Sequence, residues 1–150
     1  MASVFFRAGV VAVVRHPDLQ RVLAFERADA SGNWQLPQGG IDLGEYPIEA
    51  VWRELMEETG LGPDHVDVMA EFPEWVVYEW PDHVRATKPN RRERLGQAQR
   101  WFLFNARSAD VEPQPDGREF IAWQWVAPAW LVDHVPDWRR DAYAKVLGTL

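Results

Sequence analysis

The stretch GGIDLGEYPIEAVWRELMEETGL, which runs from Gly39 to Leu61, is the part of this chain that decides its fold. Tyr46-Pro47 is a good helix start, because proline needs no amide donor in a first turn. Gly60 supplies a left-handed stop at the other end. We therefore predict a helix from Pro47 to Thr59.

The predicted helix carries three carboxylates on one stripe. With ~3.6 residues per turn, Glu54, Glu57 and Glu58 form an i, i+3, i+4 set. The apolar side is expected to consist of Ile48, Val51, Trp52 and Leu55. Like charges at this spacing destabilise an isolated helix by a few tenths of a kcal/mol per pair, so the cluster needs a counter-charge.

A divalent cation is one source of that charge, since Arg53 alone cannot neutralise three glutamates. Oxygen ligands without cysteine favour a hard ion, Mg²⁺ or Mn²⁺, over zinc. An acidic helix face exposed to solvent is the alternative interpretation. Gly39 and Gly40 favour the metal, because paired glycines let backbone carbonyls approach an ion or a phosphate closely.

Written as spacing, the stretch is G-x5-E-x7-R-E-L-x-E-E-x-G-L. Its defined positions are Gly39, Glu45, Arg53, Glu54, Leu55, Glu57, Glu58, Gly60 and Leu61. This pattern resembles the signature of the Nudix hydrolases at every defined position. The resemblance implies an α+β Nudix fold, with a mixed β-sheet sandwiched between α-helices.

Roles for the helix residues follow from this resemblance. It implies that Glu54, Glu57 and Glu58 bind the metal ions and that Gly39 can lend its carbonyl. The arginine matching Arg53 belongs to the catalytic box, where it and Glu45 mainly orient the cluster.

The resemblance extends to one subgroup, which contains bacterial RNA 5′ pyrophosphohydrolases and the dinucleoside tetraphosphate hydrolases that cleave asymmetrically. The similar segments are residues 34–41, 96–102, 119–126 and 138–143. Tyr78 stands where dinucleoside polyphosphate hydrolases often carry a tyrosine, so it is a predicted substrate contact. Nearly the whole chain is covered, and its 150 residues are the size of a single domain, which we expect to span 1–150.

The general base is predicted outside the helix. By resemblance the subgroup uses a glutamate that also touches metal, and Glu119 occupies that place. An ordinary loop carboxylate is the alternative interpretation of Glu119, and Glu57 is the alternative base.

Four further residues are predicted to contact substrate. Arg7 and Arg27 match subgroup arginines directed toward substrate and phosphate, a task that suits a forked guanidinium. Trp138 and Arg139 stand where the RNA pyrophosphohydrolases usually carry phenylalanine and lysine. Surface charge is the alternative for the arginines, and an anchor for the terminal helix is the alternative for the tryptophan.

The net charge of −7 argues against general nucleic-acid binding through bulk electrostatics. The positive charge is nevertheless concentrated in a predicted basic loop, which contains Arg85, Lys88, Arg91, Arg92, Arg94 and Arg100. This loop is either a guide for phosphate or RNA or simply a solvated loop.

The chain contains no cysteine, which is compatible with the cytoplasm, and we expect a cytoplasmic location. The apolar run from Ala8 to Val14 is far below the ~20 residues of a membrane span and lacks the pattern of a signal peptide, so we expect a buried strand and no membrane association.

Apolar and alternating runs predict the remaining elements. Strands are expected at Val4 to Val14, Val22 to Phe25, Val66 to Glu79, Gln99 to Phe104 and Phe120 to Val126. Two more helices are expected at Pro128 to His134 and Asp137 to Leu147, with Asp137 as the N-cap.

The expected function is Mg²⁺-dependent hydrolysis of a phosphoanhydride in a nucleoside polyphosphate. The substrate is either the 5′ end of triphosphorylated RNA, which loses pyrophosphate, or a dinucleoside tetraphosphate. A housecleaning nucleotide pyrophosphatase is the enzymatic alternative. The other alternative is a module that senses a nucleotide without cleaving it. Such relatives are expected to lose metal-ligand carboxylates, and this chain keeps all three. Protein partners stay open.

Overall fold

The computed structural model describes residues 5–87 and 94–150. Its elements are, in chain order, β1 (Phe5–Arg15), β2 (Val22–Arg27), β3 (Trp34–Gln35), β4 (Gln38–Gly40), α1 (Pro47–Thr59), β5 (Val66–Glu71), β6 (Val76–Glu79), α2 (Asp82–Ala86), β7 (Arg94–Ala106), β8 (Phe120–Val126), α3 (Pro128–His134) and α4 (Asp137–Leu147). None of the helices in these ranges is long and apolar enough to cross a membrane.

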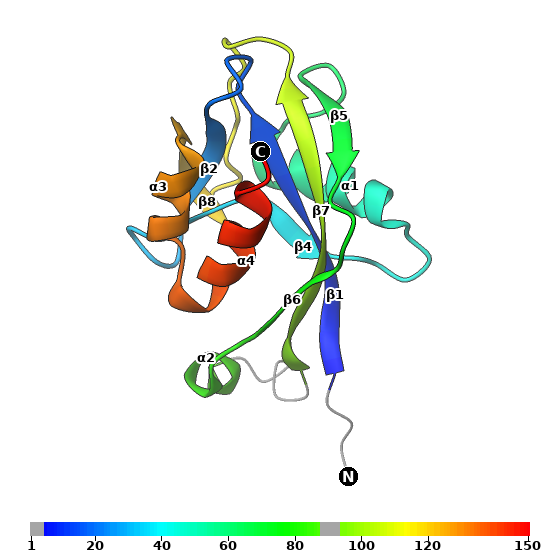
Figure 1. Cartoon of the computed structure of the whole chain (residues 1–150), viewed down its shortest axis with the longest axis vertical. Coiled ribbons are helices and arrows are strands. Elements are labelled where there is room, and N and C mark those ends of the chain that lie inside the picture. The colour runs from blue at the N-terminus through cyan, green and yellow to red at the C-terminus, as the bar shows by residue number, and fades with distance from the viewer. Residues whose placement is uncertain (1–4, 88–93) are drawn as a thin grey trace.

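The strands of the described chain form one mixed sheet (Figure 1). Its centre is the parallel pair of β1 and β7, which keep one register from Phe6 and Gly96 to Arg15 and Asn105. Parallel neighbours need a long crossover, and the connection between them contains α1. On the far side of β1, antiparallel pairing adds β4 and β2, and β2 in turn pairs with β3 and β8. β5 and β6 pair with the other edge of β7.

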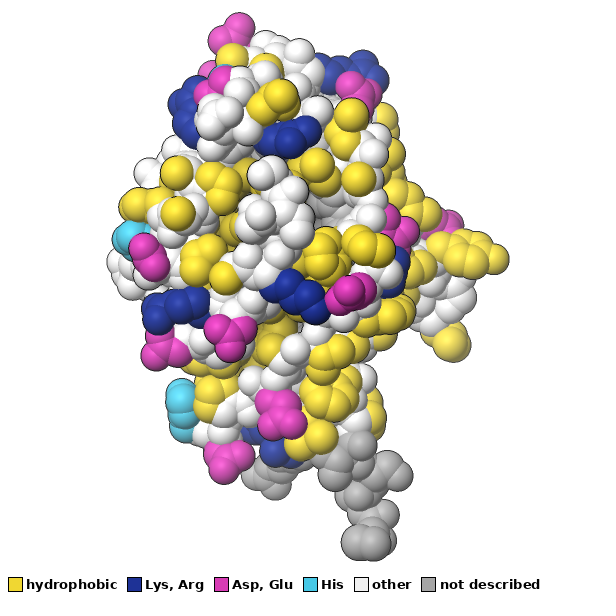
Figure 2. All heavy atoms as spheres, viewed as in Figure 1, with side chains coloured by type: hydrophobic (Ala, Val, Ile, Leu, Met, Phe, Trp, Pro, Cys, Tyr) yellow, Lys and Arg dark blue, Asp and Glu magenta, His cyan; other side chains and the backbone are white. Residues whose placement is uncertain are grey.

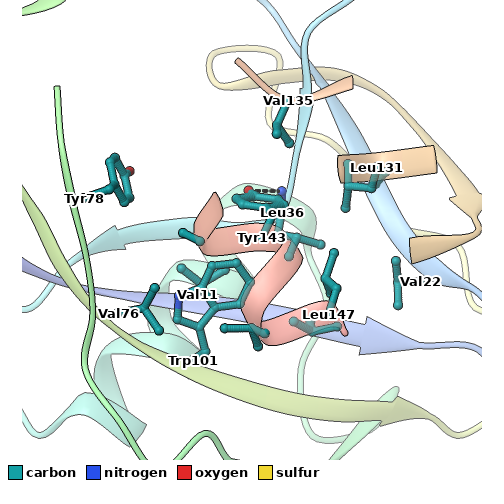
Figure 3. Close-up of a cluster of buried hydrophobic side chains, with 14 of the residues drawn as sticks. Val11, Val22, Leu36, Val76, Tyr78, Trp101, Leu131, Val135, Tyr143 and Leu147 are labelled. Atoms are coloured by element: carbon teal, nitrogen blue, oxygen red, sulfur yellow. Dashed lines mark hydrogen bonds between the residues drawn. The ribbon is translucent and has the colours of Figure 1, made fainter. Parts of the chain in front are cut away.

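Helices cover both faces of this sheet, which explains why β1 is apolar without interruption from Ala8 to Val14. Successive side chains of a strand point to opposite faces, so Val10, Ala12 and Val14 face α1. Val11 and Val13 face the other way, into a cluster with α3 and α4 (Figure 3). The predicted α+β architecture, a mixed sheet between helices, is confirmed.

Helix α1 begins at Pro47 and ends at Thr59, as predicted. Gly60 follows with φ of 72°, the left-handed conformation that a glycine stop provides. The amide of Tyr46 donates to Glu49 Oε1 at 2.9 Å, which closes the first turn. On the predicted apolar side Val51 and Leu55 are buried, but Ile48, in the first turn, is 38% exposed.

Two other sequence predictions need correction. The strand expected from Val66 to Glu79 is two strands, β5 and β6, because Pro73 lies between them and has no amide to donate to β7. α3 and α4 have the predicted bounds, but Asp137 is the first helical residue and Pro136 is the N-cap. The negative charge of Asp137 still lies at the helix N-terminus, where the dipole favours it.

The predicted basic loop was wrong at three of its arginines. Arg85 lies in α2, while Arg94 and Arg100 lie in β7. Arg100 is paired with Glu71 through Nε and Oε2 at 2.6 Å and stacks over the ring of Trp75 at 5.3 Å, so its charge is compensated. Lys88, Arg91 and Arg92 lie outside the described residues. On the face in Figure 2, basic and acidic side chains are interspersed.

Candidate active site

A cavity of about 560 Å³ lies between α1, the sheet and the start of α4. It brings together eight of the side chains and backbone positions predicted from the sequence, namely Arg7, Arg27, Gly39, Glu54, Glu58, Glu119, Trp138 and Arg139. Three other predicted residues, Arg53, Glu57 and Tyr78, do not line it. The cavity has an acidic end formed by α1 and a cationic wall formed by the sheet and α4.

The acidic end is formed by two carboxyl groups, the buried Glu58 and the partly buried Glu54. Glu58 is 5% exposed, because it follows Val51 and Leu55 on the stripe of α1 that faces the sheet. Its Oε2 accepts a hydrogen bond from the amide of Gln38 at 3.2 Å. Burial, and then the charge of Glu54, raises the pKa of Glu58 well above its usual range. Burial likewise raises the pKa of Glu54. Glu54 is paired with Arg53, whereas no cation is paired with Glu58 among the described residues.

Gly39 permits the position of Glu54. A Cβ atom built on Gly39 would lie 2.0 Å from the carboxyl carbon of Glu54, a distance that no side chain tolerates. A Cβ atom on Gly9, across the β1–β4 pair, would lie 2.8 Å from the carbonyl oxygen of Gly39. Glycines at both positions allow the loop, the strand and the carboxylate to meet.

Replacing Gly39 with alanine should therefore displace the Glu54 carboxylate. The obstructing atoms are the far end of a flexible side chain, so we expect little loss of thermal stability but a loss of kcat/KM of roughly tenfold or more. Gly44→Ala is the matched control, because Gly44 has φ of 81° and a Cβ atom there would meet nothing within 4 Å, so that this substitution strains the backbone alone. Similar kinetics for Gly39→Ala and wild type would contradict this role.

Arg53 holds the acidic end from outside the cavity. Its guanidinium donates to Glu45 through Nε at 2.8 Å and through Nη2 at 2.9 Å, and Nη2 also donates to the carbonyl of Gly40 at 2.9 Å. Nη1 donates to Glu54 Oε1 at 2.8 Å. The hydrogen bonds from Arg53 lower the pKa of Glu45 to about 2. One arginine thus ties the loop before α1 to a carboxylate of the cavity.

Glu57 is placed differently from its two neighbours. Its side chain is 58% exposed and accepts a hydrogen bond from Arg53 Nη1 at 3.4 Å. In residues 5–87 and 94–150, no group of three or more histidine, cysteine, aspartate or glutamate side chains is arranged to hold a metal ion. Glu57 would have to turn toward Glu54 and Glu58 to complete such a group, and its metal role stays a prediction.

Glu119 reaches the cavity from a loop that Asp116 shapes. Asp116 Oδ1 accepts hydrogen bonds from three consecutive amides, those of Arg118 at 3.0 Å, Glu119 at 2.9 Å and Phe120 at 3.2 Å. The carbonyl of Glu119 accepts from the amide of Ala28 at 2.8 Å, which fixes the loop to the end of β2. The charge of Glu119 contributes to the raised pKa of Glu58, so the two carboxyl groups face the same space.

The cationic wall consists of arginines on three elements. Arg7 lies on β1 against the backbone of Gly40, where a Cβ atom would be 2.5 Å from its Nη2. Arg27, at the end of β2, and the buried Arg139, on α4, both donate to the side chain of Gln35. Trp138 lies beside them, with its ring edge-on to His83 at 6.2 Å.

Tyr78 lies behind the cavity. It is 9% exposed and belongs to the cluster under α4, and its hydroxyl accepts a hydrogen bond from Gln97 Nε2 at 2.9 Å. Gln97 does line the cavity. The structure thus places Tyr78 where it can position a cavity residue.

Sequence reasoning missed several cavity residues, namely Gln35, Gln38, Gln97 and Arg118. A signal for one of them was present in β7, where Gln97 and Gln99 alternate with other residues and so share one face of the strand. Buried amides on one face of a strand indicate a polar surface beneath it. Arg118 gave no such signal, because an exposed arginine beside Glu119 resembles any loop charge.

A search of protein families matches the NUDIX domain to residues 5–147, and the chain belongs to the Nudix hydrolase family. It is 39% identical over 139 residues to the RNA pyrophosphohydrolase of Dinoroseobacter shibae, a match that covers 91% of this chain and 86% of that protein. It is 37% identical over 146 residues to the RNA pyrophosphohydrolase of Francisella tularensis subsp. mediasiatica, with coverage of 95% and 91%.

The fold has solved counterparts. The dihydroneopterin triphosphate pyrophosphohydrolase of E. coli superimposes with a TM-score of 0.72 and 21% sequence identity, covering 99% of this chain and 100% of that one. This likeness supports the Nudix fold, and the sequence relatives support the subgroup.

Proposed function

We propose that this Nudix hydrolase removes pyrophosphate from the 5′ end of triphosphorylated RNA, in the cytoplasm, with the chain acting as one domain. The observation that carries the proposal is the cavity itself, which joins the carboxyl groups of Glu54 and Glu58 to a wall of arginines and a tryptophan. A substrate for such a site combines a polyphosphate with a base. The relatives named as RNA pyrophosphohydrolases favour RNA over a dinucleoside tetraphosphate.

The acidic end fits a divalent cation. The buried Glu58 and the partly buried Glu54 lie side by side with raised pKa values, and a hard cation would add positive charge to that of Arg53. Mg²⁺, or Mn²⁺ in its place, would be held by Glu54, Glu58, Glu57 and Glu119, with the carbonyl of Gly39 as a further ligand. When bound, the ion supplies positive charge to the phosphate oxygens and lowers the pKa of a water molecule.

The residues of the chain would perform the remaining tasks. Arg7, Arg27 and Arg139 hold the phosphates in line, since guanidinium groups bind phosphate through two donors at once. Glu119 takes a proton from the attacking water as its oxygen bonds to phosphorus and the bridging P–O bond breaks. The products are pyrophosphate and an RNA with a 5′ monophosphate.

The proposal is tested by comparing kcat/KM for four substrates in the presence of Mg²⁺. These are triphosphorylated RNA, diadenosine tetraphosphate, diadenosine triphosphate and ADP-ribose. We expect triphosphorylated RNA to be the best of them. A higher kcat/KM for diadenosine tetraphosphate would instead identify a dinucleoside tetraphosphate hydrolase, and uniformly low values would favour a housecleaning enzyme.

Trp138 is expected to stack on a nucleobase of the substrate. Trp138→Ala should then lower kcat/KM for nucleotide substrates. The corresponding loss of transition-state stabilisation should be roughly 1 to 3 kcal/mol, the usual contribution of one stacked base. Cleavage of inorganic tripolyphosphate, which has no base, should be almost unchanged and serves as the control. Equal losses on both substrates would mean that Trp138 only anchors α4.

A further inference from the structure

Gln35 lies between two arginines of the cavity wall. Its Oε1 atom accepts a hydrogen bond from Arg27 Nη1 at 2.8 Å and a second one from Arg139 Nη1. The residue is 2% exposed, so water does not compete for this oxygen. Both neighbours are guanidinium groups, which only donate, and the amide must therefore direct its oxygen toward them.

The two arginines differ in how their charges are compensated. Arg27 is paired with Asp29 through two hydrogen bonds of 2.8 Å each. Arg139 is 6% exposed, and no carboxylate lies within ion-pair distance of it in the part of the chain that the structure describes. Its Nε also has no hydrogen-bond partner among the described residues. A buried guanidinium group without an anionic partner destabilises the folded protein unless a bound anion compensates its charge.

The backbone beneath Gln35 is held on two sides. In β3, Gln35 is paired with Phe25 of β2. The next amide, that of Leu36, donates to the hydroxyl of Tyr143 at 3.0 Å, a hydrogen bond drawn in Figure 3. Tyr143 follows Arg139 by four residues, so both point from one face of α4 toward β3. The backbone of Gln35 is therefore held in place, and its side-chain oxygen determines where the two guanidinium groups lie.

We propose that Gln35 is a positioning residue that holds Arg27 and Arg139 as a single fork for the polyphosphate chain of the substrate. Two guanidinium groups repel each other, and a shared acceptor brings them together. Because this acceptor is neutral, it adds no negative charge to that of Asp29 and leaves the positive charge of Arg139 available to the cavity, whereas a carboxylate would cancel part of it. The inference rests on the proposed function, which supplies a polyphosphate as the anion.

The test compares three variants with the wild type. Gln35→Leu has similar size but no acceptor, and Gln35→Glu keeps an acceptor but adds a negative charge. Tyr143→Phe is the matched control, since it removes the neighbouring hydrogen bond between α4 and β3 and leaves the fork intact. Each protein is titrated with inorganic tripolyphosphate by calorimetry at two salt concentrations, and kcat, KM and Tm are measured separately.

We expect Gln35→Leu to weaken tripolyphosphate binding roughly tenfold or more, the usual effect of losing a hydrogen bond to a charged group, and to raise KM more than it lowers kcat. Gln35→Glu should keep its Tm, lose affinity and show a flatter salt dependence. Tyr143→Phe should lower the Tm while its affinity stays within about twofold of wild type.

Two results would overturn the proposal. One is wild-type affinity in a folded Gln35→Leu protein or, if that variant does not fold, in Gln35→Glu. The other is an equal loss of affinity in Tyr143→Phe, which would show that docking of α4 alone matters. The titration needs no turnover. A wild type that hydrolyses no substrate, but whose tripolyphosphate binding depends on Gln35, would refute the proposed hydrolysis and support the fork.

Discussion

Glu58→Gln is expected to lower kcat by roughly 10²-fold or more while the protein remains folded. The substitution keeps the size of the side chain but removes the charge that we propose holds the cation. Turnover is measured at saturating Mg²⁺. Glu112→Gln, which changes an exposed carboxylate that does not line the cavity, is the control and should behave as wild type. Near-wild-type turnover of Glu58→Gln would remove Glu58 from the metal site.

The same variant should be more stable than the wild type when metal is absent. The pKa of Glu58 is raised in the folded protein, so its ionised form is disfavoured there, and the wild type loses stability as pH rises above the unfolded value near 4.5. A glutamine does not ionise. The gain in Tm of Glu58→Gln in a chelating buffer should accordingly be small at about pH 5 and larger at about pH 8. A gain that shrinks with rising pH would contradict the burial of an unpaired carboxyl group.

Glu119→Gln is expected to have the second large effect. If Glu119 takes the proton from water, its loss should lower kcat by roughly 10²-fold or more, with a much smaller change in KM. It should also alter the acidic limb of the pH–rate profile. The loop should survive, because Asp116 holds it through backbone amides and the substitution leaves these untouched.

Glu57→Gln, measured in parallel, tests the alternative base. A small rate loss and an unchanged pH profile for Glu119→Gln, together with a changed profile for Glu57→Gln, would transfer the role to Glu57. The exposed position of Glu57 beside Arg53 makes this variant informative, since its carboxylate reaches the cavity only after it leaves that contact.

The sequence by itself determined much of the local structure and the chemical class of the site. Helix α1 has its predicted bounds because a proline start and a left-handed glycine stop depend only on neighbouring residues. Apolar and alternating runs likewise indicated most of the strands, because burial on one or both faces of a sheet shows in the local pattern of side chains. The nine fixed positions from Gly39 to Leu61 predicted the family, which the comparisons confirm.

Only the tertiary structure decided which of these residues meet. Periodicity put Glu57 and Glu58 on one stripe, yet docking of α1 buries Glu58 and leaves Glu57 exposed, because neighbours on a helix differ by about 100° in direction. Gln35 and Arg139 are separated by 104 positions in the chain, and no local pattern specifies their contact. Such contacts depend on how α4 packs against the sheet, and it is this packing that turns separate polar residues into one cavity wall.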